Sequence, residues 1–298
     1  MRVANLDNRL VLVRDGECVD VQKASDGLFS SDPQAVFERW EPFTSWAQSP
    51  AARQADRIRL DEKRLGAPAP RPRQVFAIGL NYADHAEENS LEIPARPAVF
   101  TKYPTSLTGP YDTVVLPSST VDWEVELVVV IGARAHGVRE GDAWHHVAGL
   151  TVGQDVSERR IQVQGQGSVP QFSLGKSFPG FSPTGPVLVT PDELTDRNDL
   201  AIGCAVNGET MQQSRTSRMI FSVARLITWI SAICPMLPGD LIYTGTPAGI
   251  GAARKPRRFL APGEELHSWI DGIGALRNRL AAGPTYPDGI GLSGSEKS

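Results

Sequence analysis

The sequence predicts a β-rich mixed α+β fold with a small N-terminal α/β module. Segments with the two-residue period of strands outnumber helical segments, and the two kinds do not alternate regularly, which argues against a doubly wound parallel sheet. A run of glycine, alanine and proline at residues 66–72 predicts a stiff linker. We therefore place the module at residues 1–70 and the main domain at residues 71–282. A tail rich in Gly, Pro and Ser follows at residues 283–298, and we expect it to be disordered.

The composition of the 298 residues is that of an ordinary globular protein, with 41% hydrophobic and 21% charged residues. Acidic and basic residues are interspersed and the formal net charge is -4, so nothing indicates a nucleic-acid or membrane partner. The 3 cysteines lack metal-type spacing, which is typical of a reducing compartment. Residues 1–20 carry too many charges for a signal core. We expect a cytoplasmic protein.

The N-terminal module is expected to begin with a β-hairpin that turns at Asp15-Gly16, a dipeptide favoured in tight hairpins. Asp32-Pro33 predicts a helix N-cap followed by proline at the first helical position, and this helix would run through Trp40. A second helical stretch is expected at residues 46–55.

The main domain is expected to contain mostly strands and one long helix. The strands are expected at residues 75–79, 98–101, 112–116, 121–131, 147–153, 187–189, 200–206 and 241–244, with a last strand pair starting at 263–266. A short helix is expected at residues 83–88 and a long one at 222–233, where Pro235 stops it. The apolar residues on one face of the long helix are Val223, Leu226, Ile227, Ile230 and Ile233.

The segment at residues 121–131 carries the first candidate site. Alternation along a strand places Asp122, Glu124 and Glu126 on one face. Glu124 and Glu126 would lie about 7 Å apart at roughly 3.3 Å per residue, so both carboxylates can converge on one hard divalent ion. The alternative is a strand end whose polar face is in water. The residues alone leave these two interpretations even.

Each further candidate site residue also has both a functional and a structural interpretation. Asp155 ends a later strand and can complete a three-carboxylate site, or it can cap a helix. His85 and Glu88 share a helix face, which suits an oriented general base but also a solvated helix start. Lys176 can clamp an anion or extend to solvent. The glycine-rich run containing Thr246 can bind a carboxylate or simply turn.

Taken together and in this order, these blocks resemble the fumarylacetoacetate hydrolase (FAH) superfamily, and in particular its FAHD-type and bacterial 2-hydroxyhepta-2,4-diene-1,7-dioate isomerase-like branch. The resemblance covers about residues 71–280. The matching blocks are residues 81–85 with Glu88, Lys102, 109–110, 122–127, 155–157, 175–178, 185–186, 206–209, 238–240 and 244–247.

The resemblance implies a site and its cofactor. The implied metal ligands are Glu124, Glu126 and Asp155, and the implied metal is Mg2+ or Mn2+, with Ca2+ possible. The implied catalytic residues are His85, Glu88 and Lys176. The implied substrate contacts are Tyr82, Arg159, Gln162 and Thr246. Asp122 is not an implied ligand, which leaves it a role behind the ligands or at the surface. The resemblance also implies a small-molecule 2-oxo acid substrate and a homodimer.

The expected activity is metal-dependent hydrolysis of a C–C bond in a 2,4-dioxo acid of the acylpyruvate or fumarylpyruvate type. One alternative is an isomerase, tautomerase or decarboxylase of a 2-oxo dicarboxylate such as oxaloacetate or 2-hydroxyhepta-2,4-diene-1,7-dioate. An alternative from another class is a non-catalytic metal-binding homologue. Residues 164–171, expected near the pocket mouth, depart from the family's pattern, so the substrate stays open at this point.

Overall fold

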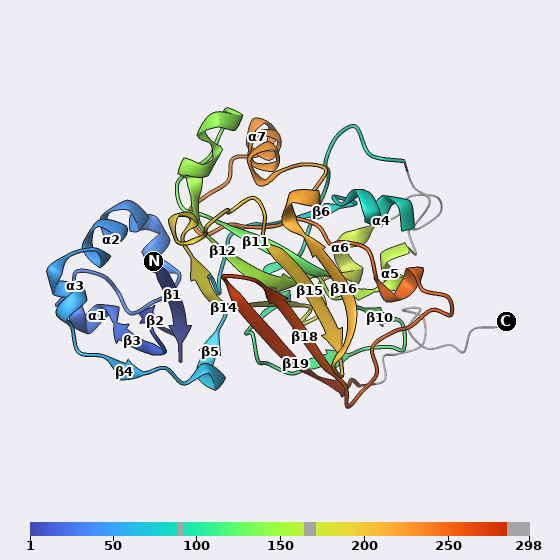
Figure 1. Cartoon of the computed structure of the whole chain (residues 1–298), viewed down its shortest axis with the longest axis horizontal. Helices are drawn as coiled ribbons and strands as arrows, with labels where there is room; N and C mark the ends of the chain where they lie inside the picture. Colours follow the sequence, from blue (N-terminus) through green and yellow to red (C-terminus); the bar gives the residue numbers. More distant parts are fainter. Residues whose placement is uncertain (89–91, 164–170, 285–298) are drawn as a thin grey trace.

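The computed structural model describes residues 1–88, 92–163 and 171–284. The predicted tail after residue 284 and nearly all of the segment 164–171 lie outside the described residues. The β-rich mixed fold is confirmed: the described part of the chain holds a 12-stranded sheet, a 5-stranded sheet and a 2-stranded ribbon. Figure 1 shows the 5-stranded sheet lying across the central strands of the large one.

The large mixed sheet runs from the N-terminal module into the main domain. Its strands, in spatial order, are β4 (Ile58–Arg59), β3 (Glu17–Asp20), β2 (Arg9–Arg14), β1 (Arg2–Leu6), β14 (Ser182–Val189), β12 (Val147–Gln154), β11 (Val125–Ile131), β17 (Leu241–Tyr243), β6 (Val75–Gly79) and β7 (Ala98–Thr101). Off this path, β5 (Leu65–Gly66) pairs with β1 and β8 (Leu107–Thr108) pairs with β14.

The other elements complete the main domain. The 5-stranded sheet has the order β16 (Glu209–Arg215), β15 (Ala201–Val206), β18 (Glu265–Ile270), β19 (Gly274–Ala282) and β9 (Val114–Leu116), and the ribbon joins β10 (Val121–Asp122) to β13 (Ser157–Glu158). The main-domain helices are α4 (Ala83–Glu88), α5 (Arg159–Val163), α6 (Phe172–Gly175) and α7 (Val223–Ile233). Helices α4, α5 and α6 gather at the end of the sheets far from the N-terminal module (Figure 1).

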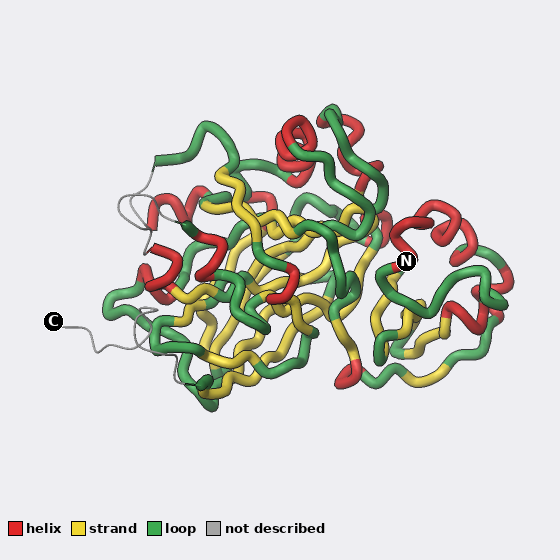
Figure 2. Tube along the Cα trace, turned by 180° about the vertical axis from the view of Figure 1, so that it is seen from behind, coloured by secondary structure: helices red, strands yellow, loops and turns green. Residues whose placement is uncertain are grey.

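The N-terminal module projects to one side of the main domain in both views (Figures 1 and 2). Its hairpin of β2 and β3 around Asp15-Gly16 is confirmed. Strand β1 pairs with β14 through Arg2↔Val189, so backbone hydrogen bonds join the module to the main sheet. The boundary at residues 70 and 71 remains a proposal.

The helices of the module differ from the predicted ones. They are α1 (Val21–Ala24), α2 (Trp40–Ala47) and α3 (Pro50–Gln54), and a 3₁₀ turn at Ala35–Arg39 lies directly before α2. The predicted helix through Trp40 is therefore a 3₁₀ turn up to Arg39, and the α-helix begins only at Trp40. The predicted stretch at 46–55 is interrupted because Ser49 caps a new helix, α3.

The predicted strand at residues 121–131 is divided, which corrects our expectation of one continuous strand. Two backbone N–H groups at the break donate to side chains instead of to a strand. Glu124 N–H donates to Gln154 Oε1 at 2.9 Å, and Val125 N–H donates to Gln212 Oε1 at 3.0 Å. Strand β10 consequently belongs to the ribbon and β11 to the large sheet. Both pieces are buried, and β11 runs into the core as predicted.

Helix α7 covers the core at the predicted place. Ser222 caps it by accepting a hydrogen bond from Arg225 N–H, and four of the five predicted apolar residues are buried. Ile233 is 73% exposed, contrary to the prediction, because it is the last helical residue and the chain turns to an extended conformation at Cys234. No helix in the described ranges is both long and apolar enough to span a bilayer.

Candidate functional site

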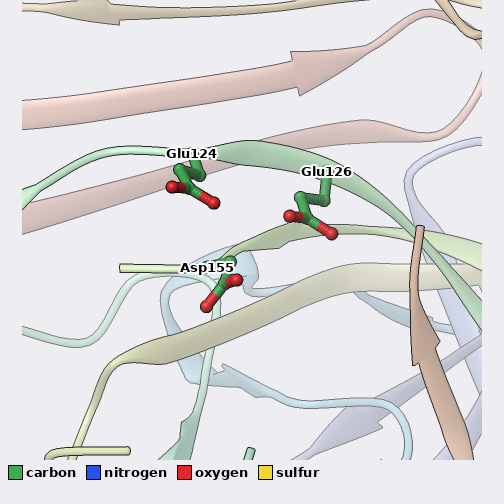
Figure 3. A group of neighbouring side chains, drawn as sticks. All are labelled: Glu124, Glu126 and Asp155. Atoms are coloured by element: carbon green, nitrogen blue, oxygen red, sulfur yellow. The ribbon is translucent and has the colours of Figure 1, made fainter. Parts of the chain in front are cut away.

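Three carboxylates converge in the core of the main domain. Glu124, Glu126 and Asp155 each offer an oxygen, and these atoms lie within 4.8 Å of one another. Figure 3 shows the two glutamates on one segment and Asp155 facing them from the next. Glu124 is 7% exposed and Glu126 1%, so the interpretation of a solvated strand end is wrong. The geometry brings the three predicted metal ligands together.

The backbone around the cluster explains this convergence. Strand β12 pairs antiparallel with β11, so its end at Gln154 lies opposite Val125. Asp155 N–H then donates to the Glu124 carbonyl at 2.9 Å, which places the two acids side by side. The Asp155 carboxylate accepts hydrogen bonds from lysines and caps none of the helices in the described part of the chain, so the alternative of a helix cap is wrong.

Glu126 is oriented from the opposite side by the chain that follows β17. Its Oε2 accepts a hydrogen bond from Gly245 N–H at 2.7 Å. Gly245 has φ +95°, and a Cβ there would lie 2.6 Å from Asn81 Cβ. Only glycine allows this close approach of the backbone.

Two buried lysines contact the acidic cluster. Lys176 Nζ lies 2.8 Å from Glu124 Oε2 and 2.5 Å from Asp155 Oδ2, and the residue is 2% exposed, so it does not extend to solvent. Lys102 Nζ donates to Asp155 Oδ1 at 2.5 Å and to the carbonyls of Lys176 and Phe181, which uses all three ammonium protons. The sequence analysis assigned Lys102 no role in the site. Its position directly after strand β7, in an apolar stretch, could have indicated a buried lysine.

The charges of the cluster are not balanced evenly. Burial raises the pKa of Glu124, but the Lys176 ammonium and the Arg159 guanidinium outweigh that effect and hold the pKa at about 2. Burial raises the pKa of Glu126 well above its usual value, and the charges of Asp155 and Glu124 raise it further. Within the described residues, Glu126 is thus a buried acid that forms no ion pair.

A divalent cation would compensate the negative charge that the lysines and Arg159 leave unbalanced at Glu126. Three carboxylate oxygens within a few ångströms form the donor set that hard cations such as Mg2+ and Mn2+ prefer. Glu126 has a single backbone hydrogen bond and two like-charged neighbours, so an added positive charge would remove the cost of ionising it. The residues present therefore fit a metal ion.

A cavity of about 460 Å³ opens beside the cluster. Glu124 reaches its wall, whereas Glu126 and Asp155 lie behind it. The other predicted site residues on its wall are His85, Arg159, Gln162, Lys176 and Thr246. Apolar side chains such as Phe100, Phe172 and Ile250 form the remaining wall. One cavity thus unites most of the predicted catalytic and substrate-binding residues.

His85 and Glu88 lie together at this cavity, on α4. His85 Nδ1 is 3.4 Å from Glu88 Oε2, and the His85 side chain is only 11% exposed, so the interpretation of a solvated helix start is wrong for this residue. Glu88 itself is held by the backbone N–H of Gly249, at 3.0 and 3.1 Å from its two oxygens. The pair has the arrangement of a histidine oriented by a carboxylate.

Thr246 and Tyr82 have different surroundings. The Thr246 hydroxyl donates to the Val125 carbonyl and accepts from Gln212 Nε2, at 2.9 and 2.8 Å. Gln212 belongs to β16, a strand that the sequence did not predict, and so it was missed. Tyr82 is fully buried and does not line the cavity, and its hydroxyl has no hydrogen-bond partner among the described residues.

Comparisons with known proteins agree on one family. A family model described as fumarylacetoacetate (FAA) hydrolase C-terminal matches residues 74–281. The Bos taurus protein named oxaloacetate tautomerase FAHD2A, mitochondrial, is 47% identical over 216 residues, which cover 72% of this chain and 68% of that protein.

Two solved structures are also similar. A proposed HpcE protein from Mycobacterium smegmatis has a TM-score of 0.88 at 50% identity, covering 95% of this chain and 100% of the other. Maleylpyruvate hydrolase from Sphingobium sp. SYK-6, in complex with manganese (II) ion and pyruvate, has a TM-score of 0.79 at 26% identity, covering 95% and 100%.

Proposed function

The chain belongs to the fumarylacetoacetate hydrolase family of enzymes, and from that premise we propose that it tautomerises a 2-oxo dicarboxylate of the oxaloacetate type. The name of the Bos taurus relative favours this alternative over the C–C hydrolase expected from the sequence. The observation that carries the proposal is the placement of His85, Lys176 and Arg159 on the wall of one cavity beside Glu124. These residues supply a proton carrier and two cations to a small anionic ligand.

The acidic cluster would hold the metal. Glu124, Glu126 and Asp155 are its proposed ligands, and the manganese ion in the Sphingobium hydrolase supports Mn2+ or Mg2+ as its identity. When bound, the ion supplies a Lewis acid that polarises the carbonyl of a 2-oxo acid. The pyruvate in that same relative supports a 2-oxo acid as the ligand class.

The protein's own residues would then move one proton. Keto–enol exchange of oxaloacetate transfers a proton between C3 and the 2-oxo oxygen, and it breaks no C–C bond. We assign the C3 proton to the His85 imidazole, which Glu88 contacts at Nδ1. The Lys176 ammonium would stabilise the negative charge that develops on the oxygen.

A product assay tests the proposal. The purified protein with Mn2+ is mixed with enol oxaloacetate, and the loss of the enol's ultraviolet absorbance is compared with the rate in chelator. We expect accelerated enol loss without CO2 release. His85→Ala should lower this rate by about 10²–10⁴-fold, the usual contribution of a general acid–base. Isothermal calorimetry should show that this variant still binds Mn2+, since His85 is not a proposed ligand.

The hydrolase remains the second candidate, supported by the fold shared with maleylpyruvate hydrolase. Acetylpyruvate under the same conditions separates the two: release of acetate and pyruvate, with oxaloacetate tautomerised only at the chelator rate, would refute the tautomerase proposal. The homodimer and the cytoplasmic location remain predictions, and light scattering tests the first.

A further inference from the structure

Asp122 is a buried acid to which neither the metal cluster nor the proton transfer assigns a role. It is fully buried, so the surface role left open by the sequence is excluded. Its Oδ1 accepts from the N–H groups of Trp123 and Gly251, each at 2.8 Å. Its Oδ2 accepts from Ala252 N–H and from Arg159 Nε, each at 2.9 Å. With its charge and lone pairs occupied, Asp122 has no need of a metal ion.

Arg159, the cation held by Asp122, lines the cavity with only part of its guanidinium uncommitted. Its Nη1 donates to Glu124 Oε1 at 2.6 Å and to Gln162 Oε1 at 2.8 Å. Its Nη2 lies 2.8 Å from Asp122 Oδ2 as an ion pair, yet within the described residues it has no acceptor in hydrogen-bonding geometry. Nη2 is buried, and among the described residues its two N–H groups are the ones of this guanidinium without a hydrogen-bond acceptor.

The same carboxylate also fixes a wall of the cavity. Ala252, whose N–H Asp122 binds, lines the cavity next to Ile250. The backbone here approaches very closely: a Cβ at Gly251 would lie 2.7 Å from Asp122 Oδ1 and 1.7 Å from the Arg258 carbonyl oxygen. Asp122 therefore sets the position of Arg159 and the position of the facing backbone at once.

We propose that Asp122 is a positioning residue that gives the cavity its preference for ligands with a second carboxylate, because it holds Arg159 with the Nη2 edge uncommitted. This inference rests on the proposed function, which places a 2-oxo dicarboxylate in the cavity. The distal carboxylate would take a charge-assisted hydrogen bond from Nη2. The carboxylate next to the 2-oxo group would remain at the acidic centre.

Two stable ligands isolate the distal carboxylate. L-malate and L-lactate share a 2-hydroxy acid group, and only malate has the second carboxylate. Calorimetric titration of the Mn2+-loaded protein gives Kd for each ligand. We expect the wild type to prefer malate, and Asp122→Asn to weaken malate binding by about tenfold or more, the value of a hydrogen bond between charged groups. Lactate binding should change by less than about twofold, because it makes no use of Arg159.

A matched control separates positioning from general damage. Asp240 is another fully buried aspartate, which accepts from Gln74 and Leu237 N–H groups outside the cavity. Asp240→Asn should leave the ratio of the two Kd values unchanged. Should Asp122→Asn fail to fold, Arg159→Lys replaces it, because lysine keeps the charge but loses the contact from Nε to Asp122. The ratio should then fall in the same way.

The outcomes are distinct. A wild type that binds malate no better than lactate overturns the inference and, with it, the dicarboxylate class of the proposed function. A wild type that prefers malate, with a preference that survives Asp122→Asn, overturns the inference alone. If Asp122→Asn weakens the binding of malate and lactate equally, the inference is overturned and Asp122 has a structural role only.

Discussion

Asp122 and Glu126 lie four residues apart, and both are buried acids, but their surroundings are opposite. Asp122 accepts three backbone N–H groups and is paired with Arg159. Glu126 accepts one backbone N–H and faces two other carboxylates. Burial of an acid therefore does not reveal its purpose; its partners do. The compensated acid holds the protein together, and the uncompensated one marks where an ion is needed.

The strand break between the two acids produces this difference. Because β10 pairs with β13 while β11 pairs with β12 and β17, the two carboxylates belong to different sheets. Asp122 meets the chain at residues 251–252, and Glu126 meets Asp155. A continuous strand would have kept both acids on one face.

The largest expected effect is on metal binding at Glu126. Glu126→Gln keeps the shape of the side chain but removes an anionic ligand, so we expect Mn2+ affinity to fall by about a thousandfold, more than the 10–100-fold that loss of an outer partner costs. Isothermal calorimetry measures it. Tight binding by this variant would remove Glu126 from the proposed ligand set.

The next effect is on stability at Asp122. Asp122→Asn should lower the free energy of unfolding by about 3 kcal/mol, since it leaves Arg159 buried without its main counter-ion. Urea denaturation of the metal-free protein gives the value. A loss below about 0.5 kcal/mol, the size of an ordinary surface substitution, would show that the ion pair is not needed.

The same amide substitution should act in the opposite direction at Glu126. In metal-free protein, Glu126→Gln removes an acid that is buried beside two like charges, and we expect the free energy of unfolding to rise by about 1 kcal/mol. Urea denaturation in chelator, beside Asp122→Asn, tests the sign. Equal losses of stability for the two variants would show that Asp122 and Glu126 do not differ in how their charges are compensated.

A comparably small effect concerns the break itself. Gln212→Leu leaves the Val125 N–H without its acceptor in the core, and we expect a loss of about 1–2 kcal/mol in the free energy of unfolding. Gln213→Leu is the matched control, because its exposed neighbouring side chain should change stability by less than about 0.5 kcal/mol. Similar values for the two variants would show that Gln212 does not support the break.

The sequence predicted elements whose pattern is local. Strand β6, helix α4 and strand β7 have the predicted bounds, because a period of two or a helical face is visible within a few residues. The three clustered acids were also found, first as a pattern and then through the family resemblance. Gln154 and Gln212 were missed because they reach their backbone partners from 30 and 87 residues away. Neither contact leaves a mark in the local sequence.

The segment at residues 245–252 affects which mutations the protein tolerates. Between residues 245 and 252, main-chain N–H groups of Gly245, Gly249, Gly251 and Ala252 hold Glu126, Glu88 and Asp122. Replacing side chains such as Pro247 or Ile250 removes none of these donors. A mutational scan that only replaces side chains would therefore not detect the role of these main-chain donors. Deletion of one residue, in contrast, would displace the donors from three acidic side chains at once.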